Sequence, residues 1–191
     1  DKAKNKILKY VPHGLNEKIF TPLPKEELKD FRNQLFQGEE KDFVIFFNSR
    51  NIRRKQIPDA MLAWKYFLDT LPKEKANKCT FVENKQLNYL YNIADAQILL
   101  TSNEGWGLTL TEAMLAGTPI IANVTGGMQD QMRFEDEDGK WFIPSKQIPS
   151  NHTGKYKKHG EWAFPVYPTN RSLQGSPKTP YIWDDRCNPE D

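Results

Sequence analysis

The sequence predicts an α/β fold in which a parallel sheet carries helices on both faces. Runs such as residues 43–47 (FVIFF) and 96–100 (AQILL) are short and mostly apolar, as in strands that are buried on both faces. Apolar residues at helical spacing occupy the stretches between such runs. Gly117 and the Gly126–Gly127 pair provide turns between elements. With 191 residues, the chain can build one domain with a substantial core.

Helix and strand signals follow one another along the first two thirds of the chain. Leu28, Phe31 and Leu35 recur at helical spacing after Pro24, which suits the first turn of a helix. The later helices show the same period, and a further helix is expected after Gly127. The predicted helices span residues 24–36, 58–71, 86–94 and 109–116, and the predicted strands span residues 43–47, 79–82, 96–100 and 119–122.

A glycine turn at residues 105–107 leads from a predicted strand into the helix that is expected to begin near Thr109. Free backbone N–H groups and the positive end of a helix dipole favour a phosphate group at such a turn. Glu104 and Glu112 flank it, and carboxylates suit this place if they accept hydrogen bonds from hydroxyl groups of a sugar or ribose attached to the phosphate. A simpler interpretation stays open for each glutamate. Glu112 would only complete a capping box with Thr109, and Glu104 would only be a solvated loop residue.

A basic cluster follows the strand at residues 43–47. Arg50, Arg53, Arg54 and Lys55 lie where ligands bind in open α/β sheets, beyond the carboxyl end of a strand. The guanidinium fork of arginine and the point charge of lysine both suit a diphosphate. The alternative is a solvated basic loop, which is the usual place of such a run.

Residues 144–191 differ in composition from the rest of the chain. Seven of the 13 prolines fall in this region, aromatic residues lie between them, and no helical period is present. The composition predicts an ordered irregular loop beside the site, with disorder as the alternative. We therefore divide the chain into a leading segment (1–23), an α/β lobe (24–143) and an irregular region of the same lobe (144–191).

Composition narrows the classes of function and location. The net charge of +2 does not favour a nucleic-acid partner. No apolar run is long enough for a transmembrane helix. Two isolated cysteines favour a reducing compartment, so the expected location is the cytoplasm, in solution or at a membrane surface. Asp136 and Asp138 form a D-x-D triplet, but the following Gly139 indicates an acidic turn rather than a metal site.

The motifs together resemble one family. Residues 103–122 (NEGWGLTLTEAMLAGTPIIA) resemble the E-x(7)-E segment of retaining, GT-B-type glycosyltransferases of group 1, where it closes the nucleotide-sugar site of the C-terminal lobe. Both glutamates, both glycines, the EAM-x-AG-x-P-I run and the later glycine pair match in order. Arg50 and Lys55 are similar to the R-x(4)-K pair of that family. Residues 10–22 are similar to the start of its C-terminal lobe, which follows an interdomain linker.

The resemblance implies a Rossmann-like lobe that binds a nucleoside diphosphate sugar and transfers a hexose, with retention, to a hydroxyl acceptor. It implies no cofactor and no obligatory metal. Arg50 and Lys55 would neutralise the diphosphate and Glu104 would orient the donor sugar, so these three are the expected catalytic residues, while Arg53 and Arg54 are expected at the surface. The other expected donor-binding residues are Gly105, Trp106, Gly107, Leu108, Thr109 and Glu112, of which Glu112 would bind the ribose.

The family also implies a partner for this lobe. Its acceptor site comes largely from an N-terminal lobe, so we expect this chain to bind the donor and to need that missing lobe, together with an unknown acceptor, for turnover. Between Leu71 and Leu87 the sequence departs from the family, because only residues 79–82 predict a strand and one βα unit is lacking. A non-catalytic nucleotide-binding or scaffold module is therefore an alternative function, and a sugar-nucleotide epimerase with the same fold is a less favoured one.

Overall fold

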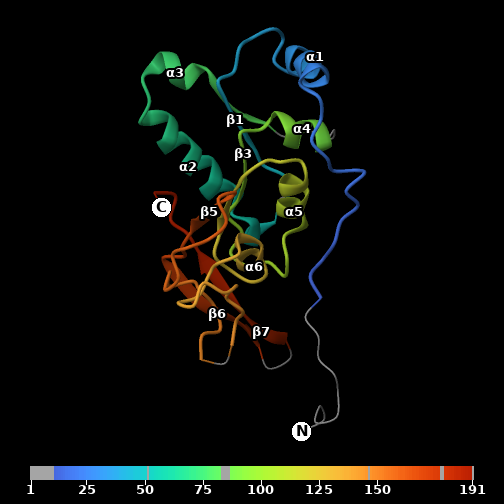
Figure 1. Ribbon diagram of the computed structural model, residues 1–191. Coiled ribbons are helices and arrows are strands. Elements are labelled where there is room, and N and C mark those ends of the chain that lie inside the picture. The colour runs from blue at the N-terminus through green and yellow to red at the C-terminus, as the bar shows by residue number, and fades with distance from the viewer. Residues whose placement is uncertain (1–10, 51, 83–86, 146, 177–178, 191) are drawn as a thin grey trace.

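A computed structural model describes residues 11–50, 52–82, 87–145, 147–176 and 179–190. Residues 1–10, the first part of the predicted leading segment 1–23, lie outside the described residues. Within the described residues, five strands form one parallel sheet in the order β2-β1-β3-β4-β5 (Figure 1). The strands are β1 (Phe43–Phe46), β2 (Cys79–Val82), β3 (Ala96–Leu99), β4 (Ile120–Asn123) and β5 (Ala163–Val166). The predicted α/β fold with a parallel sheet is confirmed.

Helices cover both faces of the sheet. The helices are α1 (Lys25–Leu35), α2 (Ile57–Asp69), α3 (Lys73–Asn77), α4 (Leu87–Ile93), α5 (Leu108–Leu115) and α6 (Met128–Met132), with a 3-10 turn η1 (Arg53–Lys55) before α2. The α2 helix lies on one face and α4 and α5 lie on the other (Figure 1). No helix in the described ranges is both long and apolar enough to cross a membrane.

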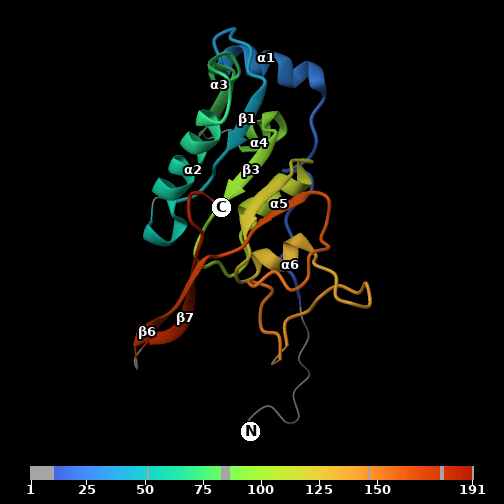
Figure 2. The ribbon, with the colours of Figure 1, turned by 90° about the vertical axis from the view of Figure 1, so that its left-hand side faces the viewer.

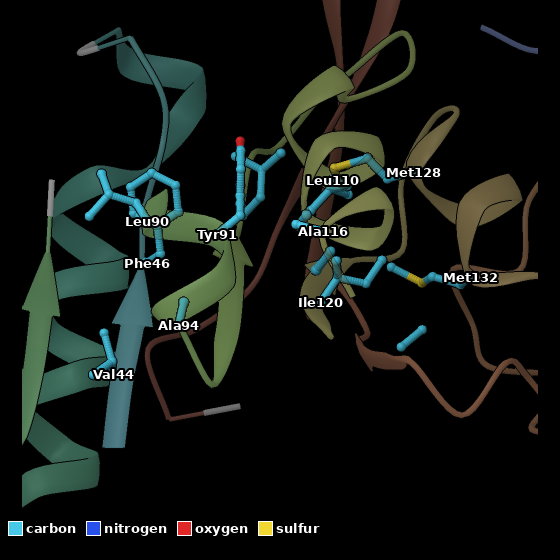
Figure 3. Packing of buried hydrophobic residues seen from close by; sticks show 14 of the residues in the cluster. Val44, Phe46, Leu90, Tyr91, Ala94, Leu110, Ala116, Ile120, Met128 and Met132 are labelled. Carbon is cyan, nitrogen blue, oxygen red and sulfur yellow. The ribbon is translucent and has the colours of Figure 1, made fainter. Parts of the chain in front are cut away.

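The larger core lies on the face that α1, α4, α5 and α6 cover. Val44 and Phe46 from β1 pack there against the apolar sides of these helices. Tyr91 of α4 is fully buried between Phe46 on one side and Leu110 on the other (Figure 3). Because alternate residues of a strand point to opposite faces, Phe47, directly after β1, packs instead in the smaller core under α2.

The order of the strands creates a crevice between β1 and β3. The chain leaves β1 toward α2 on one face and leaves β3 toward α5 on the other face. Two neighbouring parallel strands whose following helices diverge in this way form a topological switch point, where ligands bind in open α/β sheets. The segments that meet at this point are residues 47–50 with residues 52–55, which contain the basic cluster, and residues 100–107, which contain the glycine turn.

Residues 144–191 contain regular structure that the composition did not predict. β5 extends the sheet, with Ile120 of β4 in register with Ala163. An antiparallel hairpin of β6 (Asn170–Ser176) and β7 (Thr179–Arg186) follows it. The hairpin lies beyond the carboxyl ends of β1 and β3, to which their arrows point (Figure 2). The prediction of an irregular region was therefore wrong for residues 163–166, 170–176 and 179–186. A proline inside β5 and the polar sequence of β6 hide these strands.

Between residues 71 and 87, the described residues form α3 and β2 only. The strand was predicted, and the one-turn α3 was not. β2 pairs in parallel with β1, with Cys79 opposite Phe43, so the short connection still returns the chain to the same sheet. Residues 83–86, which include the first residue of the predicted helix at 86–94, lie outside the described residues.

Candidate functional site

A cavity of about 740 Å³ lies at the switch point, beyond the carboxyl ends of β1 and β3. One wall comes from the loop after β1 and the other from the loop after β3 and the first residues of α5. Eight of the nine predicted site residues line it, namely Arg50, Lys55, Glu104, Gly105, Trp106, Gly107, Leu108 and Thr109. Residues that are distant in sequence thus meet in one concave place.

An ion-pair cluster joins the two walls of the cavity. The Lys55 ammonium and the Arg54 guanidinium both donate to the same Glu104 carboxylate oxygen, Arg54 from 2.9 Å. The side chains of Lys55 and Glu104 are 12% and 16% exposed. Burial by itself would raise the pKa of Glu104, but the hydrogen bonds and charges of Lys55 and Arg54 outweigh it and lower that pKa. Glu104 is therefore an ionised acceptor, so it is not the solvated loop residue of the simpler interpretation.

Arg54 belongs to the site, although the sequence placed it at the surface. Its guanidinium also donates to the Asn103 carbonyl over 2.6 Å, and its own carbonyl accepts from Thr101 and Ser102. These bonds fasten the loop after β1 to the loop after β3. Arg53 is exposed, as expected, and Arg50 is exposed in the cavity wall.

The glycine turn is held by a second glycine turn that packs against it. Gly126 has a φ of +48°, and a Cβ on Gly126 or Gly127 would overlap the carbonyl oxygen of Glu104 or Gly105. Two backbone segments can approach this closely only because both positions lack a side chain. The Gly127 N–H donates to the Glu104 carbonyl over 3.2 Å. This contact fixes the direction in which the Glu104 side chain enters the cavity.

The α5 helix presents its first turn to the cavity. It begins at Leu108, and Gly107 precedes it with a φ of +86° and no side-chain cap. The capping box of Thr109 and Glu112 is therefore absent, which removes the simpler interpretation of Glu112. The uncapped N–H groups at residues 108–109 remain available for an anion.

Glu112 lies outside the cavity lining, behind the first turn of α5. The Tyr91 hydroxyl donates to Glu112 over 2.6 Å and accepts from the Asn48 amide over 3.1 Å. Burial raises the pKa of Tyr91, and the hydrogen bond to Glu112 raises it further. Burial also raises the pKa of Glu112 above the ordinary value of 4.5, although the Tyr91 hydrogen bond opposes this. Since Asn48 lines the cavity, this chain of bonds links Glu112 to the site.

Sequence reasoning missed the place of His13. Its ring lies 5.7 Å from the Trp106 ring, and both residues line the cavity. Nothing near His13 in the sequence indicates this contact, because the leading segment is about 90 residues from the glycine turn. In the described parts of the chain, no cluster of three or more His, Cys, Asp or Glu residues could hold a metal ion.

The two glutamates should change stability with pH in opposite directions. Glu104 has a lowered pKa in the fold, so its stabilising contribution is present above the unfolded value and is lost as the pH falls through its folded value. Glu112 has a raised pKa in the fold, so its charged form destabilises the fold. This loss of stability grows as the pH rises from the pKa of Glu112 in the unfolded chain through its pKa in the folded chain. Urea unfolding from about pH 3 to about pH 7 should show the stability gap between wild type and Glu104→Gln growing with pH. Relative to wild type, Glu112→Gln should become more stable as the pH rises over the same range. If the stability of both variants changes with pH in parallel with that of wild type, the pKa directions of both glutamates are contradicted.

Comparisons with known proteins find similar sequences for the central part of the chain and a similar fold. Residues 65–150 match the family model described as glycosyl transferases group 1. An uncharacterized glycosyltransferase of Methanocaldococcus jannaschii is 31% identical over 104 residues, which make up 54% of this chain and 26% of that protein. A trehalose synthase of Pyrococcus horikoshii is 32% identical over 76 residues, 36% of this chain and 18% of that protein. The chain thus spans about a quarter or less of these curated relatives.

A solved structure shows the same fold. The crystal structure of a glycosyltransferase from Rickettsia africae superposes with a TM-score of 0.52 and 19% identity, over 82% of this chain and 42% of that chain. The parallel five-stranded sheet of the described residues has a Rossmann-like arrangement. Residues 65–150, just under half of the chain, are thus similar to glycosyl transferases of group 1.

Proposed function

We propose that this chain is the donor-binding lobe of a retaining glycosyltransferase that transfers a hexose from a nucleoside diphosphate sugar to a hydroxyl acceptor. The observation that carries the proposal is the cavity at the switch point, where Lys55, Glu104 and the first turn of α5 meet. A cation and free helix N–H groups supply the positive potential that a diphosphate needs, and a carboxylate supplies an acceptor for sugar hydroxyl groups.

The diphosphate would bind between the N–H groups of α5 and the side chains of Lys55 and Arg50. Charge builds on the leaving diphosphate in the transition state, so cations placed there lower the barrier. Glu104 uses one carboxylate oxygen for Lys55 and Arg54, which leaves the other oxygen for donor hydroxyl groups. The departing phosphate would accept the proton of the acceptor hydroxyl. Glu112, held by Tyr91, would accept from the ribose.

Turnover would require residues beyond this chain. The curated relatives are about four times longer or more than the segments that match, which leaves enough length for a second lobe. We propose that such a lobe completes the acceptor side and that this chain alone binds the donor without efficient transfer.

Nucleotide binding tests the proposal directly. Calorimetry with UDP, GDP and ADP should show that at least one binds, and Lys55→Ala should weaken that binding roughly 10- to 100-fold, as expected for loss of a charge-assisted hydrogen bond of about 1.5–3 kcal/mol. Lys73→Ala removes a lysine from exposed α3 and should leave the affinity unchanged. If none of the three nucleotides binds at millimolar concentration, or if both variants behave alike, the donor-lobe proposal fails.

A non-catalytic nucleotide-binding module is the alternative, and sugar dependence separates the two. The hexose conjugate of the preferred nucleotide should bind with an affinity different from that of the nucleotide alone, because Glu104 contacts the sugar. Glu104→Gln should reduce that difference several-fold, since a neutral amide accepts a hydrogen bond less strongly than a carboxylate. Equal affinities for nucleotide and conjugate in the wild-type chain would favour the module over the enzyme.

A further inference from the structure

Glu104 is the one acidic residue among the described residues that line the cavity at the switch point, which we call the donor cavity. The same lining carries three cations, Arg50, Arg54 and Lys55. Two of them, Arg54 and Lys55, donate to one oxygen of the Glu104 carboxylate. The carboxylate therefore neutralises part of the positive charge that the proposed diphosphate would use.

The carboxylate and a bound diphosphate would be close neighbours. The Lys55 ammonium has three N–H donors, so it can bind Glu104 and a phosphate oxygen at the same time. Two oxygens that share one ammonium lie within about 6 Å of each other, since each of the two hydrogen bonds is about 2.8 Å long. The side chains of Lys55 and Glu104 are little exposed, so solvent screens the repulsion between carboxylate and phosphate only in part.

The loop that carries Glu104 is fastened to the hairpin. The Ser102 carbonyl accepts from the Asp185 N–H over 2.8 Å, and the Asn103 amide donates to the Trp183 carbonyl over 3.0 Å. The two residues directly before Glu104 are therefore both held in place. The carboxylate keeps its position when a ligand binds.

The hairpin is a firm support for this loop, because Asp185 is anchored in the lobe. Asp185 is 2% exposed, and its carboxylate accepts from Thr125 over 2.7 Å and from Arg171 over 2.6 Å. Its carbonyl accepts from the Asn123 amide of β4 over 2.6 Å. Moving the loop and Glu104 away from a neighbouring anion would therefore require breaking buried hydrogen bonds.

The proposed transfer changes the charge of the phosphate beside Glu104. In the donor, this phosphate carries an ester bond to the hexose and one negative charge. Transfer breaks the bond between the anomeric carbon and the phosphate oxygen, and the electron pair stays on that oxygen, which takes the proton of the acceptor hydroxyl. At neutral pH the terminal phosphate then loses this proton to water, because its second pKa is about 6. The product nucleotide thus gains about one negative charge in the place where the donor presents neutral sugar hydroxyl groups.

We propose that the Glu104 carboxylate distinguishes the donor from the product nucleotide by charge, and that its repulsion of the terminal phosphate promotes product release. Toward the donor, the carboxylate accepts from sugar hydroxyl groups. Toward the product, it meets a dianion in place of the sugar. The inference rests on the proposed donor function, and it gives Glu104 a second role beyond the orientation of the hexose.

Three ligands separate charge from sugar contacts. The first is the preferred nucleotide of UDP, GDP and ADP, whose terminal phosphate carries about two charges at neutral pH. The second is its terminal methyl ester, which has one charge there and no sugar hydroxyl groups, and the third is its glucose conjugate. In wild type, calorimetry should show that the methyl ester binds at least as tightly as the nucleotide, although cations alone would favour the dianion.

Glu104→Gln should reverse this order. The glutamine keeps the size of the side chain and an acceptor oxygen for Arg54 and Lys55, but it removes the charge. The variant should bind the nucleotide about tenfold more tightly than wild type, and the methyl ester by about threefold more tightly at most. It should bind the glucose conjugate no more tightly than wild type does, because an amide is a weaker acceptor for sugar hydroxyl groups.

Glu39→Gln is the matched control. Glu39 also pairs with a lysine, Lys41 over 2.7 Å, but it precedes β1 and therefore lies at the opposite end of this strand from the donor cavity. This variant should leave the affinities for all three ligands unchanged.

The outcomes separate this inference from the donor function on which it rests. If none of the three ligands binds to wild type at millimolar concentration, the donor function fails and the charge proposal falls with it. If the ligands bind but Glu104→Gln tightens the nucleotide and the methyl ester equally, or tightens neither, the charge proposal alone is overturned. The wild-type comparison needs no variant, so clearly tighter binding of the nucleotide than of its methyl ester also overturns the proposal, even if Glu104→Gln does not fold.

Discussion

Gly126→Ala should destabilise the fold by about 3 kcal/mol and abolish nucleotide binding. An added Cβ would overlap the Glu104 carbonyl oxygen, which is backbone and cannot rotate away, and the φ of +48° disfavours a side chain as well. The structure can accept alanine only by moving the loop that carries Glu104 and the start of α5. Urea unfolding should show a lower midpoint, and calorimetry with the preferred nucleotide should show no binding.

The same substitution at Gly14 is the matched control. A Cβ at Gly14 meets no atom within 4 Å, so Gly14→Ala should leave the unfolding midpoint nearly unchanged. Gly127→Ala should behave like Gly126→Ala, because its Cβ would overlap the Gly105 carbonyl oxygen. A normal midpoint together with normal binding in Gly126→Ala would show that the two glycine turns are not in contact.

Asp185→Ala should cost about 2–4 kcal/mol, because it leaves a cation and a hydroxyl group without their buried acceptor. Arg171 and Thr125 would lose their bonds to the carboxylate, and the hairpin would lose side-chain contacts that join it to the sheet. Chemical unfolding measures the loss. Hydrogen exchange should also show faster exchange in β6 and β7, and the Trp183 indole resonance should shift because its surroundings change.

An exposed aspartate provides the comparison. Asp138 pairs with Lys140 over 3.6 Å, and both side chains are about three quarters exposed. Solvent screens such a pair, so Asp138→Ala should change stability by less than about 1 kcal/mol. Equal costs for the two substitutions would mean that the buried position of Asp185 is unimportant.

Local patterns were sufficient to predict most elements of the lobe, although not the short helix α3. The apolar run at residues 43–47 became β1, and the helical period after Pro24 became α1. Such signals are local, because a strand buried on both faces must be apolar throughout and a helix on a sheet must be apolar along one side. β5 was not predicted, since Pro165 contradicts a strand and the pairing with β4 spans more than 40 residues.

In the candidate site, too, contacts between residues that are distant in the sequence could not be predicted. The positions of the site residues in the sequence predicted that they lie near the ends of two strands, and in the structure all of them except Glu112 line one cavity. The role of Arg54 depends on its carbonyl and guanidinium contacts with residues about 50 positions away, which no local pattern contains. The bond from Tyr91 to Glu112 is equally non-local, and so is the position of Trp183. The placement of site residues could thus be predicted where a sequence motif carries it, but not where only the fold brings distant residues together.

The outer edge of β5 is poorly suited to aggregation by strand addition. On the inner side, the Ile120 and Val124 N–H groups donate to the carbonyls of Trp162 and Val166, so the backbone nitrogens of Ala163 and Pro165 face outward. The Ala163 N–H donates to the Gly160 carbonyl, and Pro165 has no backbone N–H. A strand from another molecule would find no donors at these positions, which protects this side of the sheet from fibril-like growth.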